Sequence, residues 1–100
     1  MPLTIILQDE QGIPIKISDS VFEYDELEKI KIDDFRKFIL IKYIDFYGDT
    51  VFNNLQMDDL ILDFKHLKFF SKQHIAIDEI IELAKQCKSS VHTYIKFEGD

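Results

Sequence analysis

The residue types that most often carry chemistry are few in this 100-residue chain, and they stand far apart. The histidines are His66, His74 and His92, and the single cysteine is Cys87. None of the histidines has a second His or a Cys within ligand spacing. A zinc site needs three or four such ligands brought together. The pattern therefore favours no zinc site and allows no internal disulfide.

Two pairs of side chains have a spacing that could hold a metal. Asp63 and His66 stand three residues apart and Asp59 and Asp63 four apart, so each pair would share one face of a helix. The first pair supplies only two ligands, whereas the second, with Asp58, could hold a hard cation. The alternative is a solvated acidic helix face, which is the favoured interpretation. We expect neither a metal nor a cofactor.

Groups for nucleophilic catalysis or phosphate binding are also missing from the sequence. Cys87 falls near the end of a predicted helix, where the dipole raises the pKa of a thiol and makes it a poor nucleophile. There is no Gly-x-Ser-x-Gly elbow and no glycine-rich phosphate loop. Arg36 is the only arginine, which argues against phosphate or carboxylate substrates. We expect a protein that is not an enzyme.

Charge narrows the classes of partner. Nineteen acidic residues against twelve basic ones leave a net charge of −7, which opposes binding to nucleic acid or to anionic lipid and favours a basic protein partner. The chain begins without a basic signal-peptide region and contains no apolar run near the length of about 20 residues that spans a bilayer. A lone cysteine fits a reducing compartment. We expect a single cytoplasmic domain covering residues 1–100.

The elements that must position these residues follow from periodicity. Residues 3–8 and 13–17 alternate like two strands joined by a turn at 9–12, and Pro14 places the second strand at a sheet edge. The second strand has one apolar face, made by Ile13, Ile15 and Ile17. Residues 91–97 alternate as a third strand. With helices on its apolar face, this predicts an α+β fold: a small antiparallel sheet, the N-terminal hairpin plus the C-terminal strand, packed against two to three helices.

Two helices are predicted from apolar stripes at helical spacing. The first starts near Asn53 or Asn54, where an Asn followed by Gln56 resembles a capping box. The second follows a break at residues 69–74. Their inner faces are, respectively, Met57, Leu60, Ile61, Phe64 and Leu67, and Ile77, Ile80, Ile81, Ala84 and Cys87. A short helix is also possible within residues 25–29.

Residues 35–44 fit two interpretations. Phe35, Phe38, Ile39 and Tyr43 fit a helix entered through acidic residues, whereas the run 38–41 is equally a strand signal. The length of the apolar stretch favours the helix. Gly48 ends it in either case.

Acidic side chains next to aromatic ones are the candidate binding residues. Tyrosine is favoured at the centre of protein interfaces, and charge at the rim directs encounter. The alternative is that these aromatics are half-buried edges of the core. The candidate partner-binding residues are Glu23, Tyr24, Asp25, Glu26, Asp45, Tyr47, Asp49, Asp58, Asp59 and Asp63.

Two segments carry a resemblance to a known kind of protein. Residues 43–56, Tyr-Ile-Asp-Phe-Tyr-Gly-Asp-Thr-Val-Phe-Asn-Asn-Leu-Gln, and the terminal residues 94–100, Tyr-Ile-Lys-Phe-Glu-Gly-Asp, with the Leu-rich helix, resemble small acidic bacterial proteins of the immunity type. The resemblance implies a cytoplasmic, cofactor-free binding protein that neutralises a toxin by direct binding. The leading expectation is an inhibitor that occludes a basic partner, such as a toxin nuclease domain. The alternative is a regulatory or adaptor subunit without catalytic activity, and a third class is a metal-dependent enzyme.

Overall fold

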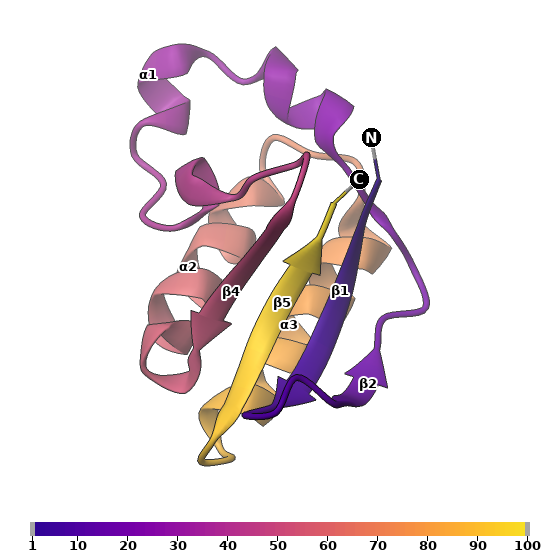
Figure 1. The fold of residues 1–100 in the computed structure, drawn as a ribbon. Coiled ribbons are helices and arrows are strands. Elements are labelled where there is room, and N and C mark those ends of the chain that lie inside the picture. The colour runs from indigo at the N-terminus through magenta and orange to yellow at the C-terminus, as the bar shows by residue number, and fades with distance from the viewer. Residues whose placement is uncertain (1, 100) are drawn as a thin grey trace.

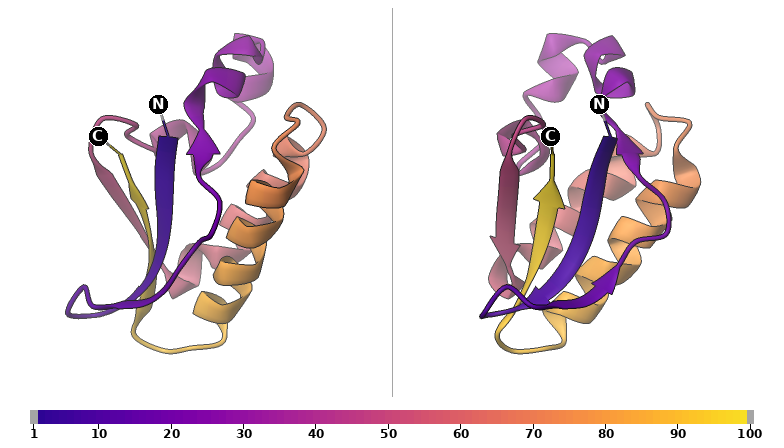
Figure 2. Two further views of the ribbon diagram at one scale, coloured as in Figure 1. Left: turned by 90° about the vertical axis from the view of Figure 1, so that its right-hand side faces the viewer. Right: turned by 45° about the vertical axis from the view of Figure 1, so that its right-hand side comes forward.

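A single β-sheet carries two helices on one of its faces. The structure is a computed structural model that describes residues 2–99, except for the side chains of residues 24–26. Figure 2 shows the two layers edge-on, with the helices on one side of the sheet and nothing covering the other. The α+β prediction is confirmed.

The first strand lies in the middle of the sheet. β1 (Pro2–Asp9) pairs antiparallel with β5 (Thr93–Glu98), and β5 pairs antiparallel with β4 (Asp49–Asn53), which forms one edge (Figure 1). On the other side of β1 lie β2 (Pro14–Ile17) and the two-residue β3 (Phe22–Glu23). The strand order β2-β1-β5-β4 confirms the predicted hairpin and C-terminal strand. The strands β3 and β4 were not predicted.

The turn between β1 and β2 forms at the predicted residues. Asp9 Oδ1 accepts the main-chain N–H groups of Gln11 and Ile13, both at 2.9 Å. Gly12 has φ of 81°, which a glycine adopts without steric cost. The edge position of β2 is also confirmed.

The apolar face of β2 does not contact the helices. The register places Lys16 opposite Leu7, on the helix side of the sheet, and Ile17 opposite Ile6, on the uncovered side. Ile13, Ile15 and Ile17 are consequently all at least half exposed. Their alternation is correct, but the face they form is a surface.

Both predicted long helices are present. Asn53 accepts the N–H groups of Leu55 and Gln56, and Gln56 Oε1 accepts the N–H of Asn53, which is the predicted capping box. It opens a single 3-10 turn, η3 (Asn54–Gln56), that leads into α2 (Met57–Leu67). After the predicted break, α3 (His74–Lys88) buries the predicted inner face.

Aromatic rings join the helix layer to the sheet. Phe64 on α2 stacks on Phe97 of β5 with ring centroids 5.8 Å apart, and meets Phe22 edge-on at 5.7 Å. Phe52 of β4 packs edge-on against Phe97 at 5.8 Å. These four rings are almost fully buried, so one core extends across the central strands.

The segment before β4 is irregular, and the prediction of a helix over residues 35–44 is wrong. The chain there forms η1 (Tyr24–Lys29), a four-residue α1 (Ile32–Phe35) and η2 (Ile41–Tyr43). The N–H groups of Ile39, Leu40 and Ile41 point instead to the carboxylate of Asp63 on α2, at 3.0, 2.6 and 3.1 Å. The short helix expected within residues 25–29 is present as η1.

The C-terminal strand starts two residues later than predicted. His92 has φ of 62°, and Val91 is exposed. Thr93 Oγ1 donates a hydrogen bond shared between the carbonyl oxygens of Ser90 and Cys87, at 2.7 and 3.1 Å, and so ties the end of α3 to the start of β5.

No helix within residues 2–99 combines the length and the apolar character that a bilayer crossing requires.

Candidate partner-binding surface

A tight turn over residues 45–50 leads into β4, and its own side chains fix its backbone. Asp45 Oδ1 accepts the N–H of Tyr47 at 2.9 Å, and Thr50 Oγ1 accepts the N–H of Asp45 at 2.8 Å. The N–H of Gly48 donates to the carbonyl oxygen of Asp45 at 3.4 Å. These local bonds are the ones that an aspartate at the start of a turn typically makes.

The C-terminal segment restrains the same turn through a main-chain hydrogen bond. The N–H of Gly99 donates to the carbonyl oxygen of Gly48 at 2.7 Å. A Cβ atom at Gly99 would lie only 2.5 Å from the carbonyl oxygen of Phe46 and 2.7 Å from that of Gly48. Only glycine allows this approach. With Phe46 buried beneath it, the turn has little freedom to move.

Tyr47 stands at the tip of this turn with 71% of its surface exposed. Asp45 and Asp49 flank it, and both are exposed. Lys96 Nζ lies 3.8 Å from a carboxylate oxygen of Asp49 and 3.2 Å from one of Glu98. Because one lysine is shared by two carboxylates, the region around the tyrosine stays negative. Three predicted binding residues therefore meet at one place.

Further acidic residues lie along the same end of the sheet. The register puts Thr4, Glu98 and Asp49 side by side on three neighbouring strands, and Glu23 opposite Pro2 on the next. The main chain of Glu23 is fixed by Gln73, which accepts its N–H at 2.6 Å and donates to its carbonyl oxygen at 2.9 Å. The predicted binding side chains of Tyr24, Asp25 and Glu26 lie outside the described part of the structure.

Asp58 and Asp59 lie at the other end of β4. Figure 1 shows β4 running from the turn at its start to the beginning of α2 at its end. Five strand residues span roughly 16 Å, so these acids do not share a patch with Tyr47. Asp58 Oδ1 lies 2.7 Å from Lys88 Nζ at the end of α3, whereas Asp59 is exposed.

Asp63 does not belong to the surface, and its prediction as a binding residue is wrong. Only 1% of it is exposed, and its two oxygens accept the three N–H groups of residues 39–41. A buried carboxylate needs such donors to offset the loss of water. Asp63 therefore attaches the irregular segment to α2.

Comparison of the chain with protein-family models, curated proteins and solved structures found no match in any of the three. The resemblance to immunity-type proteins remains a prediction.

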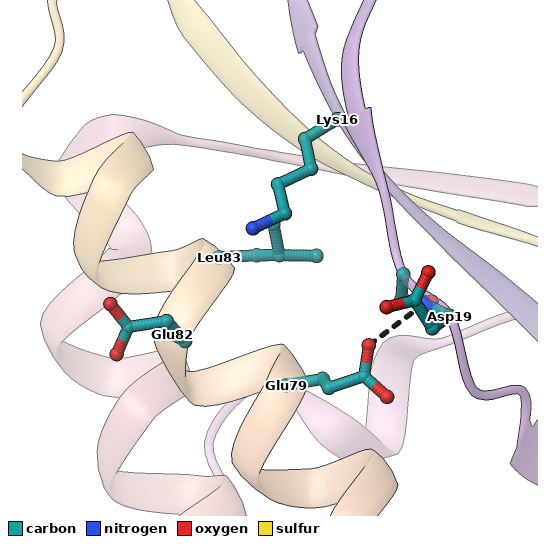
Figure 3. A pocket seen from close by; sticks show the side chains of 6 residues that line it. Lys16, Asp19, Glu79, Glu82 and Leu83 are labelled. Atoms are coloured by element: carbon teal, nitrogen blue, oxygen red, sulfur yellow. Dashed lines mark hydrogen bonds between the residues drawn. The ribbon is translucent and has the colours of Figure 1, made fainter.

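Another group of polar residues lies between β2 and α3 (Figure 3). Glu79 accepts the main-chain N–H groups of Asp19 and Ser20 at 2.8 and 3.1 Å. The pKa of Glu79 is lowered, first by the hydroxyl of Ser20 and then by these N–H groups. The hollow beside it measures about 190 Å³, and Lys16 extends over it above Leu83. These bonds attach the loop after β2 to α3.

Metal ligands do not converge in the described part of the chain. Among the side chains placed there, no three of the types His, Cys, Asp and Glu come together as a cation site. Asp59 and His66, the two partners considered for Asp63 from sequence, are exposed, whereas Asp63 is buried.

The contributions of Glu98 and Gly99 to the surface were missed from sequence. The terminal residues 94–100 were part of the resemblance, but their contact with the turn joins segments about fifty residues apart. Finding this contact from sequence would have required the prediction of β4. That strand has only five residues, and it begins and ends with turn-forming residue types.

Proposed function

We propose that this chain is a protein-binding inhibitor that covers a basic protein partner, with the turn at residues 45–50 at the centre of the contact. One observation carries the proposal: an exposed tyrosine, Tyr47, is held on a fixed turn between two exposed carboxylates, Asp45 and Asp49. This combination supports recognition of a partner surface.

The energetics of association favour such an arrangement. Tyrosine adds a large contact area while losing few rotatable bonds, and it is enriched among residues that dominate binding energy. A backbone already fixed before binding avoids the cost of ordering a loop. Carboxylates at the rim add speed and selectivity for a positively charged partner.

The proposed partner is a basic toxin domain, and the inhibitor acts by occluding it. This part rests on the resemblance of residues 43–56 and 94–100 to immunity-type proteins and on the net charge of −7. The site needs neither metal nor cofactor for this role, and the proposed compartment is the cytoplasm.

An adaptor subunit is the second candidate, and the uncovered face of the sheet favours it. Ile13, Ile15 and Ile17 expose apolar area there. Apolar side chains grouped at a surface are typical of contacts between proteins. Stable self-association in light scattering, together with a harmless neighbouring gene, would favour the adaptor over the inhibitor.

Co-expression tests the proposal directly. The gene adjacent to this one is expressed in a host cell with or without the wild-type chain, and survival is counted. Rescue by the wild-type chain is the expected result, with loss of rescue for the Tyr47→Ala variant but not for Tyr43→Ala, whose tyrosine is similarly exposed outside the turn. A neighbouring gene product that does not harm cells would remove the inhibitor proposal.

A further inference from the structure

The outer edge of β4 offers main-chain groups that no described segment of the chain uses. Among residues 2–99, β4 pairs only with β5, through a regular ladder from Asp49 opposite Glu98 to Asn53 opposite Tyr94. Gly48 bonds to Gly99 in this ladder, so alternate residues 50 and 52 also face β5. The N–H and C=O groups of Asp49 and Val51 consequently point away from the sheet.

A bond at the end of the strand supports this alternation. The N–H of Asn53, two residues after Val51, donates to Gln56 Oε1 in η3 and not to β5. The residue is therefore in phase with Asp49 and Val51, and its N–H is satisfied by the cap. Asp49 and Val51 have the same orientation, without such an acceptor among the described residues.

The opposite edge of the sheet carries a proline and a register shift, whereas β4 carries neither. Pro14 in β2 has no N–H to donate, and the β1–β2 register shifts between Leu7 and Gln8. Prolines and bulges are devices that discourage an edge from pairing with another chain. β4 contains no proline and keeps its register along its full length.

Exposed apolar side chains accompany the open edge. Tyr47 precedes β4, Val51 lies in it with 48% of its surface exposed, and Leu55 follows it with 87% exposed. Tyr47 belongs to the turn before β4, Val51 to the strand itself and Leu55 to the 3-10 turn after it. An added strand would meet an apolar contact at its middle and one near each end.

Charge decides which kind of chain would add there. Asp45 and Asp49 lie at one end of the edge and Asp58 and Asp59 at the other, against the two lysines that pair with them. A segment bearing lysine or arginine complements this distribution. A second copy of the chain would bring another net charge of −7 to the same place.

We infer that β4 accepts an extended, lysine- or arginine-bearing segment of the protein partner as an additional strand, with main-chain hydrogen bonds to Asp49 and Val51. This rests on the proposed function and gives it a binding mode. Addition of a strand supplies affinity through the main chain and selectivity through alternate side chains. With the partner segment added, the strand order of the sheet would be β2-β1-β5-β4-partner.

A model peptide tests the edge without the natural partner. The probe is the hexapeptide acetyl-Lys-Val-Lys-Val-Lys-Val-amide, and the readout is amide hydrogen exchange by NMR on the wild-type chain. At saturating peptide, exchange at Asp49 and Val51 should slow at least tenfold, and the matching Glu-Val peptide should give no slowing. Unchanged exchange at both amides, or slowing at Ile15 and Ile17 of β2, would overturn the inference.

A proline variant removes a donor from the edge without removing a hydrogen bond seen among the described residues. Val51→Pro deletes an N–H that bonds to no described group, while Val51→Ala keeps it and serves as the matched control. The lysine peptide should bind Val51→Ala and lose at least tenfold in affinity for Val51→Pro. Equal binding to both overturns the inference. Should Val51→Pro fail to fold, the exchange measurement on the wild-type chain decides alone.

The adjacent gene product separates this inference from the proposed function. Suppose that this product binds the wild-type chain, binds Tyr47→Ala with lower affinity, and binds Val51→Pro and Val51→Ala equally tightly. The edge inference then fails and the inhibitor proposal stands. If it binds no form of the chain while the peptide still protects Asp49 and Val51, the inhibitor proposal fails and the edge site stands. A dimer in light scattering that Val51→Pro abolishes would name a second copy as the occupant and overturn the basic-segment inference.

Discussion

The main-chain N–H of Gly99 donates to the carbonyl oxygen of Gly48 across a distance of 2.7 Å. This bond joins the end of the chain to the turn that presents Tyr47. It makes the C-terminal strand a structural support of the candidate surface. The shape of the turn therefore depends on the close approach of Gly99, which has no side chain to prevent it.

Substitution of Gly99 should cost more than substitution of Gly48. A Cβ atom at Gly99 meets two main-chain oxygens, at 2.5 and 2.7 Å, whereas at Gly48 it meets a carboxylate oxygen of Asp45 at 2.9 Å. A side chain can rotate away, but the backbone of the turn must shift. We expect Gly99→Ala to lower the free energy of unfolding by about 1–3 kcal/mol and Gly48→Ala by less, measured by chemical denaturation. Equal losses would contradict the fixed turn.

Asp63→Asn should destabilise the fold strongly. An amide offers a single acceptor oxygen and turns an N–H₂ group toward the buried N–H donors of residues 39–41. We expect a loss of about 2–3 kcal/mol in the free energy of unfolding. Asp59→Asn on the same helix is the control, and its effect should stay within about 0.5 kcal/mol because the residue is exposed. Similar effects of both variants would mean that Asp63 does not hold the segment.

Glu79 should make a small contribution to stability that depends on pH. Its pKa in the folded chain is below the ordinary value of 4.5, because hydrogen bonds from Ser20 and Asp19 favour the ionised form. The contribution is therefore complete above pH 4.5 and is lost as pH falls through the folded pKa. At pH 7 we expect the free energy of unfolding of the wild type to exceed that of Glu79→Gln by less than about 1 kcal/mol, because solvent screens the carboxylate of Glu79. The difference should shrink toward pH 3 in urea titrations.

Cys87 should resist thiol reagents in the native protein. The residue is fully buried on the inner face of α3, and burial raises the pKa of its thiol. Since the thiolate is the reactive form, labelling requires opening of the fold. We expect the labelling rate with a disulfide reagent to rise by at least a hundredfold in unfolding concentrations of urea. Rapid labelling without denaturant would contradict the packing of α3.

Elements with a long internal period could be predicted from the sequence. The stripes of α2 and α3 and the alternation of β1 and β5 each repeat over several turns or residue pairs, so a local pattern identifies them. β4 has five residues with turn-forming types at both ends, and only its pairing with β5 makes it a strand. Its existence is a tertiary property that no local pattern contains.

Two errors have the same physical origin. Asp63 stands next to acids on a predicted exposed face, yet donors more than twenty residues earlier make its burial favourable. Ile15 and Ile17 form a correct apolar face, yet the register with β1 turns it away from the helices. In both cases burial depends on how the element packs against other elements, which its own residue pattern does not contain. The break at Gly48 was predicted because its signal, a single glycine, is local.

The association of this chain with the product of the adjacent gene tests the central claim most directly. Its dissociation constant should be measured by calorimetry for wild type, Tyr47→Ala and Tyr43→Ala at low and high salt. We predict that Tyr47→Ala raises the constant at least tenfold, that Tyr43→Ala leaves it unchanged, and that salt weakens all three complexes. A complex that forms equally tightly with Tyr47→Ala would contradict the account.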